Sequence, residues 1–134
     1  MNVEETFIMI KPDAVRARKS GEIITRIERS GLTIERMEMC TLTDDVVKEH
    51  YAHLADKPFF PSLVAFMTSG PVVKMIVSGP SAIKKMRMLM GATDPVEAAP
   101  GTIRGDYAVD VNSNVIHGSD GPDTAKLEIE RFFG

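Results

Sequence analysis

The segment Asn114-Val115-Ile116-His117-Gly118-Ser119-Asp120 places one imidazole after a short β-branched run and before a glycine and two small oxygen-bearing residues. This pattern predicts that His117 lies where a strand gives way to a helix, with its ring at the rim of a sheet. Because an unperturbed histidine has a pKa of about 6.5, its ring offers a nucleophilic lone pair at neutral pH. His117 is therefore the candidate centre for covalent chemistry, although so short a motif alone also fits a structural histidine.

Residues that could bind phosphate are present but scattered along the chain. Neither a Walker loop, GxxxxGK[ST], nor the glycine-rich loop of protein kinases occurs in the sequence. Phosphoryl transfer requires mainly in-line positioning and stabilisation of charge on the transferring oxygens. Two unit charges about 4 Å apart attract by about 4 kcal/mol at an effective dielectric constant of 20, so a triphosphate needs several cations. The candidates for this site are Lys11, Arg87, Thr93 and Arg104.

A metal site is an alternative use of the remaining histidines. His50 and His53 are followed by Asp56, at a spacing that could ligate a metal ion. We favour a structural interpretation, because His50 falls on the inward stripe of a predicted helix and His53 on its exposed side. The sequence offers no evident fourth ligand.

Apolar patterning predicts the elements that must position these side chains. Strands are expected over 6–10, 32–42, 72–78 and the residues before His117, and helices over 21–30, 43–54, 62–69, 81–90 and from Pro122 onward. Thr43 and Ser81 are the expected N-caps. Apolar alternation changes phase between Ile34 and Met37, which predicts a bulge. The segment 91–106 is expected to be a long functional loop. The order of elements indicates an α/β sandwich with helices packed on an antiparallel sheet.

Composition limits the class of protein. The chain has 134 residues, a formal net charge of −3, 43% hydrophobic and 26% charged residues, which fits a single globular domain over residues 1–134. The net charge gives no general attraction to polyanions, so phosphate-binding cations must be gathered locally. The lone cysteine, Cys40, excludes an internal disulfide and is expected to be a small buried side chain in a cytoplasmic protein. No apolar run reaches the roughly 20 residues that cross a bilayer.

Five segments, in order and at compatible spacing, resemble the nucleoside diphosphate kinase family over essentially the whole chain. They are TFIMIKPDAV, GEII, EHYAHLADKPFFPSLVAFMTSGPVV, APGTIRGDYAV and NVIHGSD. The resemblance implies an enzyme that moves the γ-phosphate of a nucleoside triphosphate, typically ATP, onto a nucleoside diphosphate. It also implies a ferredoxin-like α/β (α+β) sandwich with a four-stranded antiparallel sheet. The reaction would be ping-pong, through a phosphohistidine on His117.

The resemblance assigns a role to each matching residue. His117 would be phosphorylated on Nδ1, and Glu128 would orient and polarise its ring. Tyr51 and Ser119 would flank the phosphoryl group. The remaining residues would bind the nucleotide. Arg87, Thr93 and Arg104 would bind phosphates, and Lys11 and Asn114 would bind sugar hydroxyls and phosphates. Phe59 would stack on the base, with Val111 on the other side of the base. Mg²⁺ would arrive on the nucleotide phosphates, with no protein side chain as ligand.

The resemblance also implies a homo-oligomer, with a hexamer expected ahead of a tetramer, and neither a membrane nor a nucleic-acid partner. The chain departs from relatives at 17–20, Ala-Arg-Lys-Ser, where an arginine-glycine pair and two apolar residues are usual. Gly121 stands where many relatives have serine. The chain ends at Gly134, whereas longer members continue with a tail that contributes to subunit packing, so oligomer size is not simply inherited.

Two other functions fit parts of the sequence. A catalytically silent relative would be expected to lack His117 or an arginine, and this chain keeps them. A nucleic-acid-binding sandwich would use an aromatic-studded sheet. The chain has only two tyrosines, six phenylalanines and no tryptophan, and the basic cluster Arg16, Arg18 and Lys19 fits a solvated face.

Overall fold

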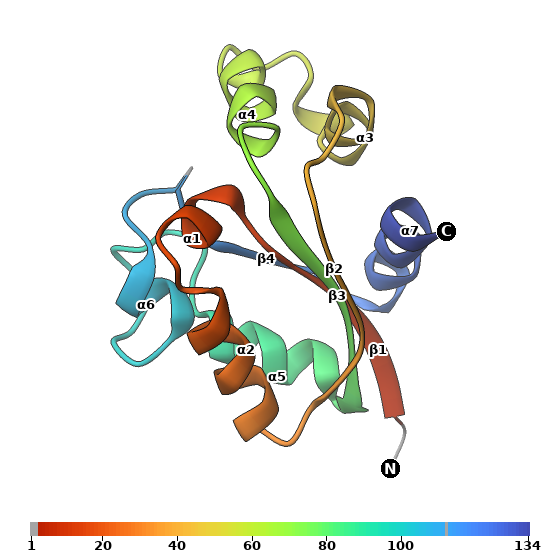
Figure 1. The fold of residues 1–134 in the computed structure, drawn as a ribbon, viewed down its shortest axis with the longest axis vertical. Coiled ribbons are helices and arrows are strands. Elements are labelled where there is room, and N and C mark those ends of the chain that lie inside the picture. The colour runs from red at the N-terminus through yellow and green to blue at the C-terminus, as the bar shows by residue number, and fades with distance from the viewer. Residues whose placement is uncertain (1–2, 112) are drawn as a thin grey trace.

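The computed structural model describes residues 3–111 and 113–134 (Figure 1). In chain order the elements are β1 (Val3–Ile10), α1 (Pro12–Arg16), α2 (Ser20–Arg29), β2 (Thr33–Cys40), α3 (Asp44–His50), a 3₁₀ turn (Ala52–Leu54), α4 (Phe60–Met67), β3 (Val72–Pro80), α5 (Ala82–Met90), α6 (Ile103–Tyr107), β4 (Ile116–Gly118) and α7 (Pro122–Phe133). The strands form one sheet in the order β2-β3-β1-β4. All three strand pairs are antiparallel, which confirms the predicted fold class.

The central strand β1 is covered on both faces. Phe7 and Met9 pack into a cluster formed with α3, α4 and α7, whereas Ile8 and Ile10 pack into a second cluster formed with α2 and α5. Figure 1 shows these two groups of helices on opposite sides of the sheet. All four side chains are fully buried. The continuous apolar run of β1 therefore follows from burial on both faces of the strand.

Edge strand β2 confirms the predicted bulge. Its register against β3 shifts between Ile34 and Arg36, because a bulge adds one residue to this strand. The extra residue also changes which side chains face the core. Beyond the bulge, Met37 and Met39 are exposed. Cys40, expected to be buried, is only partly buried at the end of this strand.

Caps explain where several helices begin. Thr43 accepts a hydrogen bond from the backbone N–H of Val46, as predicted. The expected cap at Ser81 is wrong in its chemistry: Ser81 has a φ of +55° and its side chain accepts no hydrogen bond from the helix. The carboxylate of Glu4, from β1, accepts from Ile83 N at 2.9 Å instead. This long-range cap has no local sequence signal.

Other boundaries differ from the sequence-based expectations. The helix expected over 43–54 ends at His50 and continues as the 3₁₀ turn, and the one expected over 62–69 is α4. Pro12 opens α1, because a proline fits the first turn of a helix. The segment expected to be a loop contains α6, where Thr102 accepts from Gly105 N as an N-cap. A five-residue helix is too short to show apolar periodicity.

The last helix begins at Pro122 as predicted, with Gly121 at the N-cap. Its buried side chains are Ala125, Glu128 and Phe132, whereas Ile129 and Phe133 are only partly buried. A carboxylate therefore replaces one expected apolar contact on the inner face of α7. Of the helices in residues 3–111 and 113–134, none combines the length and apolarity that a bilayer crossing requires.

Candidate active site

A cavity of about 620 Å³ brings together ten of the eleven residues singled out from the sequence. They are Lys11, Tyr51, Phe59, Arg87, Thr93, Arg104, Val111, Asn114, His117 and Glu128. The eleventh, Ser119, is almost completely buried and is not part of the cavity wall. A neighbouring, more open hollow of about 700 Å³ shares Arg87 and Asp120 but contains neither His117 nor the other cations of this set. The smaller cavity is therefore the candidate site.

His117 lies in the middle of the three-residue strand β4, opposite Met9 of β1. The strand begins one residue after Val115, which has a φ of +66°. A β-branched residue rarely adopts this left-handed conformation. Two backbone contacts hold it: Val115 N donates to Asp13 Oδ2 at 3.2 Å, and Lys11 N donates to Val115 O at 2.8 Å. The turn thus sets the direction in which the chain enters β4.

One nitrogen of His117 is paired with Glu128 of α7. Nε2 of His117 lies 3.0 Å from Oε1 and 3.1 Å from Oε2 of Glu128. Burial acts to raise the pKa of Glu128, but the hydrogen bond and charge of His117 and the hydroxyl of Ser119 outweigh it, so the pKa is lowered. An ionised carboxylate only accepts hydrogen bonds, so Nε2 carries the proton. In the neutral ring the lone pair is therefore on Nδ1.

Ser119 acts on the carboxylate rather than on the cavity. Its Oγ lies 2.5 Å from Oε1 of Glu128, to which it donates. Ser119 N also donates to Phe7 O at 3.1 Å, which ties the residue to β1. Glu128 therefore accepts hydrogen bonds from both His117 and Ser119, and these bonds restrict the orientation of its carboxylate.

Three cations from separate elements share the cavity wall. Burial, followed by the charge of Arg87, lowers the pKa of Arg104 to about 10. Burial, followed by the charge of Arg104, lowers the pKa of Lys11 to about 8, although Asp13 acts to raise it. Burial weakens the hydration of both charges, and the neighbouring cation adds repulsion in each case. The site is therefore electrostatically prepared for an anion.

Backbone carbonyls hold the guanidinium of Arg104. Nη1 donates to Gly91 O at 2.9 Å and Nη2 to Ile116 O at 2.8 Å, while Nε is buried without a hydrogen-bond partner. Gly91 ends α5 with a φ of +82°, and a Cβ there would overlap the side chain of Thr102. A glycine is therefore required for α5, α6 and Arg104 to approach this closely.

Lys11 and Asn114 meet although they are far apart in the sequence. Lys11 Nζ donates to Asn114 Oδ1 at 2.6 Å, and Asn114 Nδ2 donates to Thr93 O at 3.3 Å. Both side chains are buried, whereas Thr93 is exposed at the mouth of the cavity. The contacts connect the end of β1, the turn before β4 and the segment after α5.

Aromatic side chains also line the cavity. Phe59 is 45% exposed and lines the cavity, while Phe60 packs partly buried against the cluster formed with α3, α4 and α7. Of these two adjacent phenylalanines, only Phe59 lines the cavity, as the resemblance implied. Val111 is exposed at the rim. Burial raises the pKa of the Tyr51 hydroxyl, and the charge of Glu128 raises it further.

His50 has partners other than those expected for a metal site with His53. Its ring is buried edge-on against His117, with 4.7 Å between ring centroids, whereas His53 is exposed on the cavity wall. Ligand-type atoms of His50, His117 and Glu128 do lie within 4.8 Å of one another. Hydrogen bonds already engage them, however, including one from Arg131 to His50 Nδ1 at 2.9 Å. Sequence reasoning missed Arg131, because a basic residue in the last helical turn has no distinctive local signal.

Comparison with known proteins adds independent information. A family model described as nucleoside diphosphate kinase matches residues 4–134. The chain is 55% identical to the nucleoside diphosphate kinase of Thermobifida fusca over 131 residues, which cover 98% of this chain and 97% of that protein. It is 52% identical to the enzyme of the same name from Symbiobacterium thermophilum over 132 residues, covering 98% of this chain and 88% of that protein.

Among solved structures, the fold matches a halophilic nucleoside diphosphate kinase from Halobacterium salinarum in complex with CDP. The TM-score is 0.95 and the identity 48%, with 98% of this chain and 88% of that chain covered. The sequence, the fold and the matches agree over nearly the whole length. The chain belongs to the nucleoside diphosphate kinase family of phosphotransferases.

Proposed function

We propose that His117 is the nucleophile of a ping-pong phosphotransfer between nucleoside triphosphates and diphosphates. The observation that carries the proposal is the pairing of Nε2 with Glu128, which leaves the lone pair on Nδ1. In the first half-reaction Nδ1 attacks the γ-phosphorus of the donor. The bond from phosphorus to the bridging oxygen breaks, and the nucleoside diphosphate leaves with that electron pair. In the second, a terminal oxygen of the acceptor diphosphate attacks phosphorus and the P–N bond breaks.

The surrounding residues have complementary proposed roles. Glu128 keeps the Nε2–H tautomer and stabilises the ring as it gains positive charge, and Ser119 holds the carboxylate in place. Tyr51 flanks the phosphoryl group. Arg87, Arg104 and Thr93 bind phosphates, because uncompensated positive charge on the two arginines favours an anion in the cavity. The guanidinium of Arg104 is already held by two backbone carbonyls before a nucleotide binds, so it needs no reorganisation during the reaction.

The nucleoside is proposed to lie between the cations and the aromatic wall. Lys11 and Asn114 bind sugar hydroxyls and phosphates. Exposed Phe59 stacks on the base, with Val111 on its other side. A stacking contact is available to every base because each has a π-face, so we expect broad base tolerance.

We propose Mg²⁺ as the cofactor, bound through the nucleotide. Among the described residues of the cavity wall the carboxylates are Asp120 and Glu128, and Glu128 already accepts from His117 and Ser119. This donor set does not form a protein cage for an ion, which fits a cation carried by phosphates and water. When bound, Mg²⁺ offsets charge on the phosphate oxygens.

We further propose a homo-oligomer, with a hexamer ahead of a tetramer, acting as a single domain in the cytoplasm. Edge strand β2 exposes 50% of Met37 and 62% of Met39. Exposed apolar side chains beside unpaired strand edges favour association. The single free cysteine suits a reducing compartment. Light scattering at several protein concentrations measures the size of the assembly, and a monomer at every concentration would contradict the proposed homo-oligomer.

The experiment that tests the reaction uses γ-labelled ATP and Mg²⁺ without an acceptor. We expect acid-labile, base-stable label on the protein, absent from His117→Ala, and transferred on addition of a nucleoside diphosphate. His53→Ala is the matched control, because His53 lines the same cavity without a carboxylate partner among the described residues, and its labelling should be unchanged. An unlabelled wild-type protein, or label retained in His117→Ala, would contradict the mechanism.

A further inference from the structure

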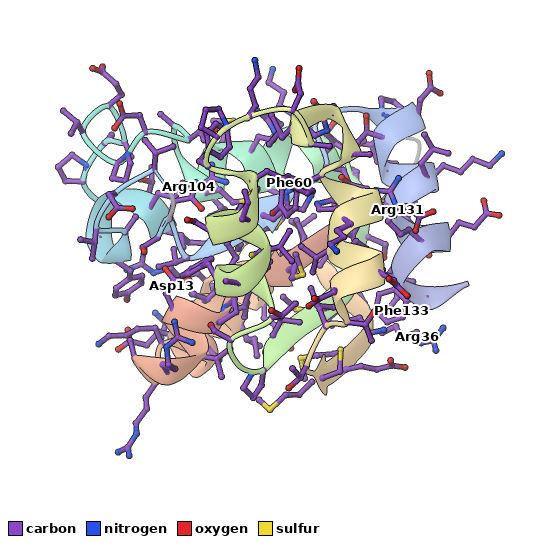
Figure 2. The ribbon with its side chains drawn as sticks, turned by 90° about the horizontal axis from the view of Figure 1, so that it is seen from above. Asp13, Arg36, Phe60, Arg104, Arg131 and Phe133 are labelled. Atoms are coloured by element: carbon purple, nitrogen blue, oxygen red, sulfur yellow. The ribbon has the colours of Figure 1, made fainter. Side chains whose placement is uncertain are left out.

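Arg131 of α7 is hydrogen-bonded to a histidine that the proposed reaction does not use. Its Nη1 lies 2.9 Å from Nδ1 of His50, the last residue of α3. Figure 2 shows Arg131 on the side of α7 that faces α3. A guanidinium can only donate, so Nδ1 of His50 must be the acceptor. His50 is therefore neutral, with its proton on Nε2.

The His50 ring fills the space between Arg131 and the catalytic pair. It is 7% exposed and packs edge-on against His117, Tyr51 and Phe132, with centroid distances of 4.7, 4.6 and 5.1 Å. Nδ1 lies 3.8 Å from Oε2 of Glu128. Because His50 is neutral and its Nδ1 lone pair accepts from Arg131, this short separation is not an ion pair.

Burial, supported by most of the surrounding charges, keeps His50 neutral. Burial lowers its pKa to about 3, and the charges of His117, Arg131 and Lys11 act in the same direction, while Glu128 opposes them. A protonated His50 would carry an N–H on Nδ1 beside Oε2 of Glu128. It would then compete with His117 for the carboxylate.

We propose that Arg131 is a positioning residue for the reaction: by donating to Nδ1 of His50 it keeps that ring in the neutral Nε2–H tautomer and reserves the Glu128 carboxylate for His117. This inference rests on the proposed role of His117. His50 lines the nucleotide cavity whereas Arg131 does not, so Arg131 acts through His50.

The second contact of Arg131 does not explain its position. Its Nε lies 3.7 Å from Oε2 of Glu49, whose side chain is 66% exposed. The Nε atom of Arg131 is buried and makes no hydrogen bond. An exposed pair with this geometry contributes little to stability. The short, buried contact is the one with His50, and the two contacts can be separated by mutation.

The test compares three variants of the full-length protein. Arg131→Met keeps a long side chain but removes the donor, Arg131→Lys restores one, and Glu49→Gln removes only the exposed pair. Nitrogen-15 NMR of labelled histidines reports the His50 tautomer directly. We expect Nε2–H in the wild type and in Glu49→Gln, and a mixed or reversed tautomer, or a protonated ring, in Arg131→Met.

The functional readout is the single-turnover rate of protein phosphorylation by ATP as a function of pH. For Arg131→Met we expect a loss of about three- to tenfold near pH 6, the effect of one positioning hydrogen bond. The acid limb should move to higher pH, because loss of the cation and of the donor lets His50 protonate more easily. ATP affinity should be unchanged, Arg131→Lys should recover most of the rate, and Glu49→Gln should match the wild type.

Each failure has a distinct meaning. If the wild type is not phosphorylated on His117, the proposed function is wrong. If it is phosphorylated and Arg131→Met shows the same rate, the same pH profile and the same His50 tautomer, only the role of Arg131 is wrong. Should Arg131→Met be too unstable to assay, the wild-type spectrum alone still decides, because a proton on Nδ1 of His50 would overturn the proposal.

Discussion

Both carboxylate oxygens of Glu128 lie within 3.1 Å of Nε2 of His117, although the two residues belong to a strand and to the second turn of the following helix. The nearly equal distances place the ring nitrogen between the two oxygens. Ser119, from the turn that joins the two elements, donates to one of them. The nucleophile, its carboxylate partner and the hydroxyl that holds the carboxylate thus all come from twelve consecutive positions, 117 to 128, of which three carry the contacts.

Glu128→Gln should lower the rate of protein phosphorylation by about 10- to 100-fold, the range found when a group that orients a metal-bound histidine is removed. A neutral amide can still accept from Nε2–H but stabilises the phosphorylated ring less well. Single-turnover kinetics measure the rate, and the Kd for ATP should change little. Glu130→Gln, an exposed position on the same helix, is the control. Equal rates for the wild type and Glu128→Gln would show that the carboxylate charge is not used.

Arg104→Ala should lower turnover on the order of 10²-fold, as for other preorganised groups that stabilise transition-state charge. It should also reduce the free energy of unfolding by about 1–3 kcal/mol, because the carbonyls of Gly91 and Ile116 lose their donor. Steady-state kinetics and urea unfolding measure the two effects separately. Arg29→Ala, at an exposed position of α2, should change neither. Turnover within a few-fold of wild type would remove Arg104 from the phosphate site.

Nucleotide binding should weaken as the pH rises through about 8, where Lys11 loses its proton. Its lowered pKa also has a consequence for stability. Between that pH and the ordinary value of 10.5 the unfolded chain binds more protons than the native one, so the contribution of Lys11 to stability rises with pH. Titration of ATP affinity against pH tests the binding, and Lys11→Met should remove the limb near pH 8. If ATP affinity still falls near pH 8 in Lys11→Met, a group other than Lys11 causes the pH dependence.

Arg18→Gly should increase the free energy of unfolding by about 0.5–1 kcal/mol. Arg18 has a φ of +62°, which costs a non-glycine residue about 1–2 kcal/mol, partly offset by the greater chain entropy of glycine. Urea denaturation gives the value, and Lys19→Gly, at a φ of −102°, should destabilise instead. If both variants shift stability in the same direction, backbone strain is not the cause.

Local patterns predicted the elements that pack regularly. The β1 run, the bulge in β2 and the Thr43 cap were all found where the sequence placed them. Two features could not be predicted from local patterns. Glu4, which lies in β1, caps α5 through a long-range contact, and α6 is too short to show apolar periodicity. The resemblance to a family supplied most of the site residues, since Arg87 or Phe59 alone would fit an ordinary surface position.

The sequence by itself determined the alternation of apolar and polar residues, the turns, and the set of imidazole, carboxylate and cationic groups that this chain can use. Only the tertiary structure decided which of these groups meet. Lys11 reaches Asn114 across 103 positions, and Arg131 reaches His50 across 81. Such pairs depend on how helices pack on the two faces of the sheet, and packing is driven by burial of apolar surface, which specifies no polar partner in the local sequence. The tautomers of His50 and His117 follow from such contacts, so the fold assigns the chemistry of these two rings.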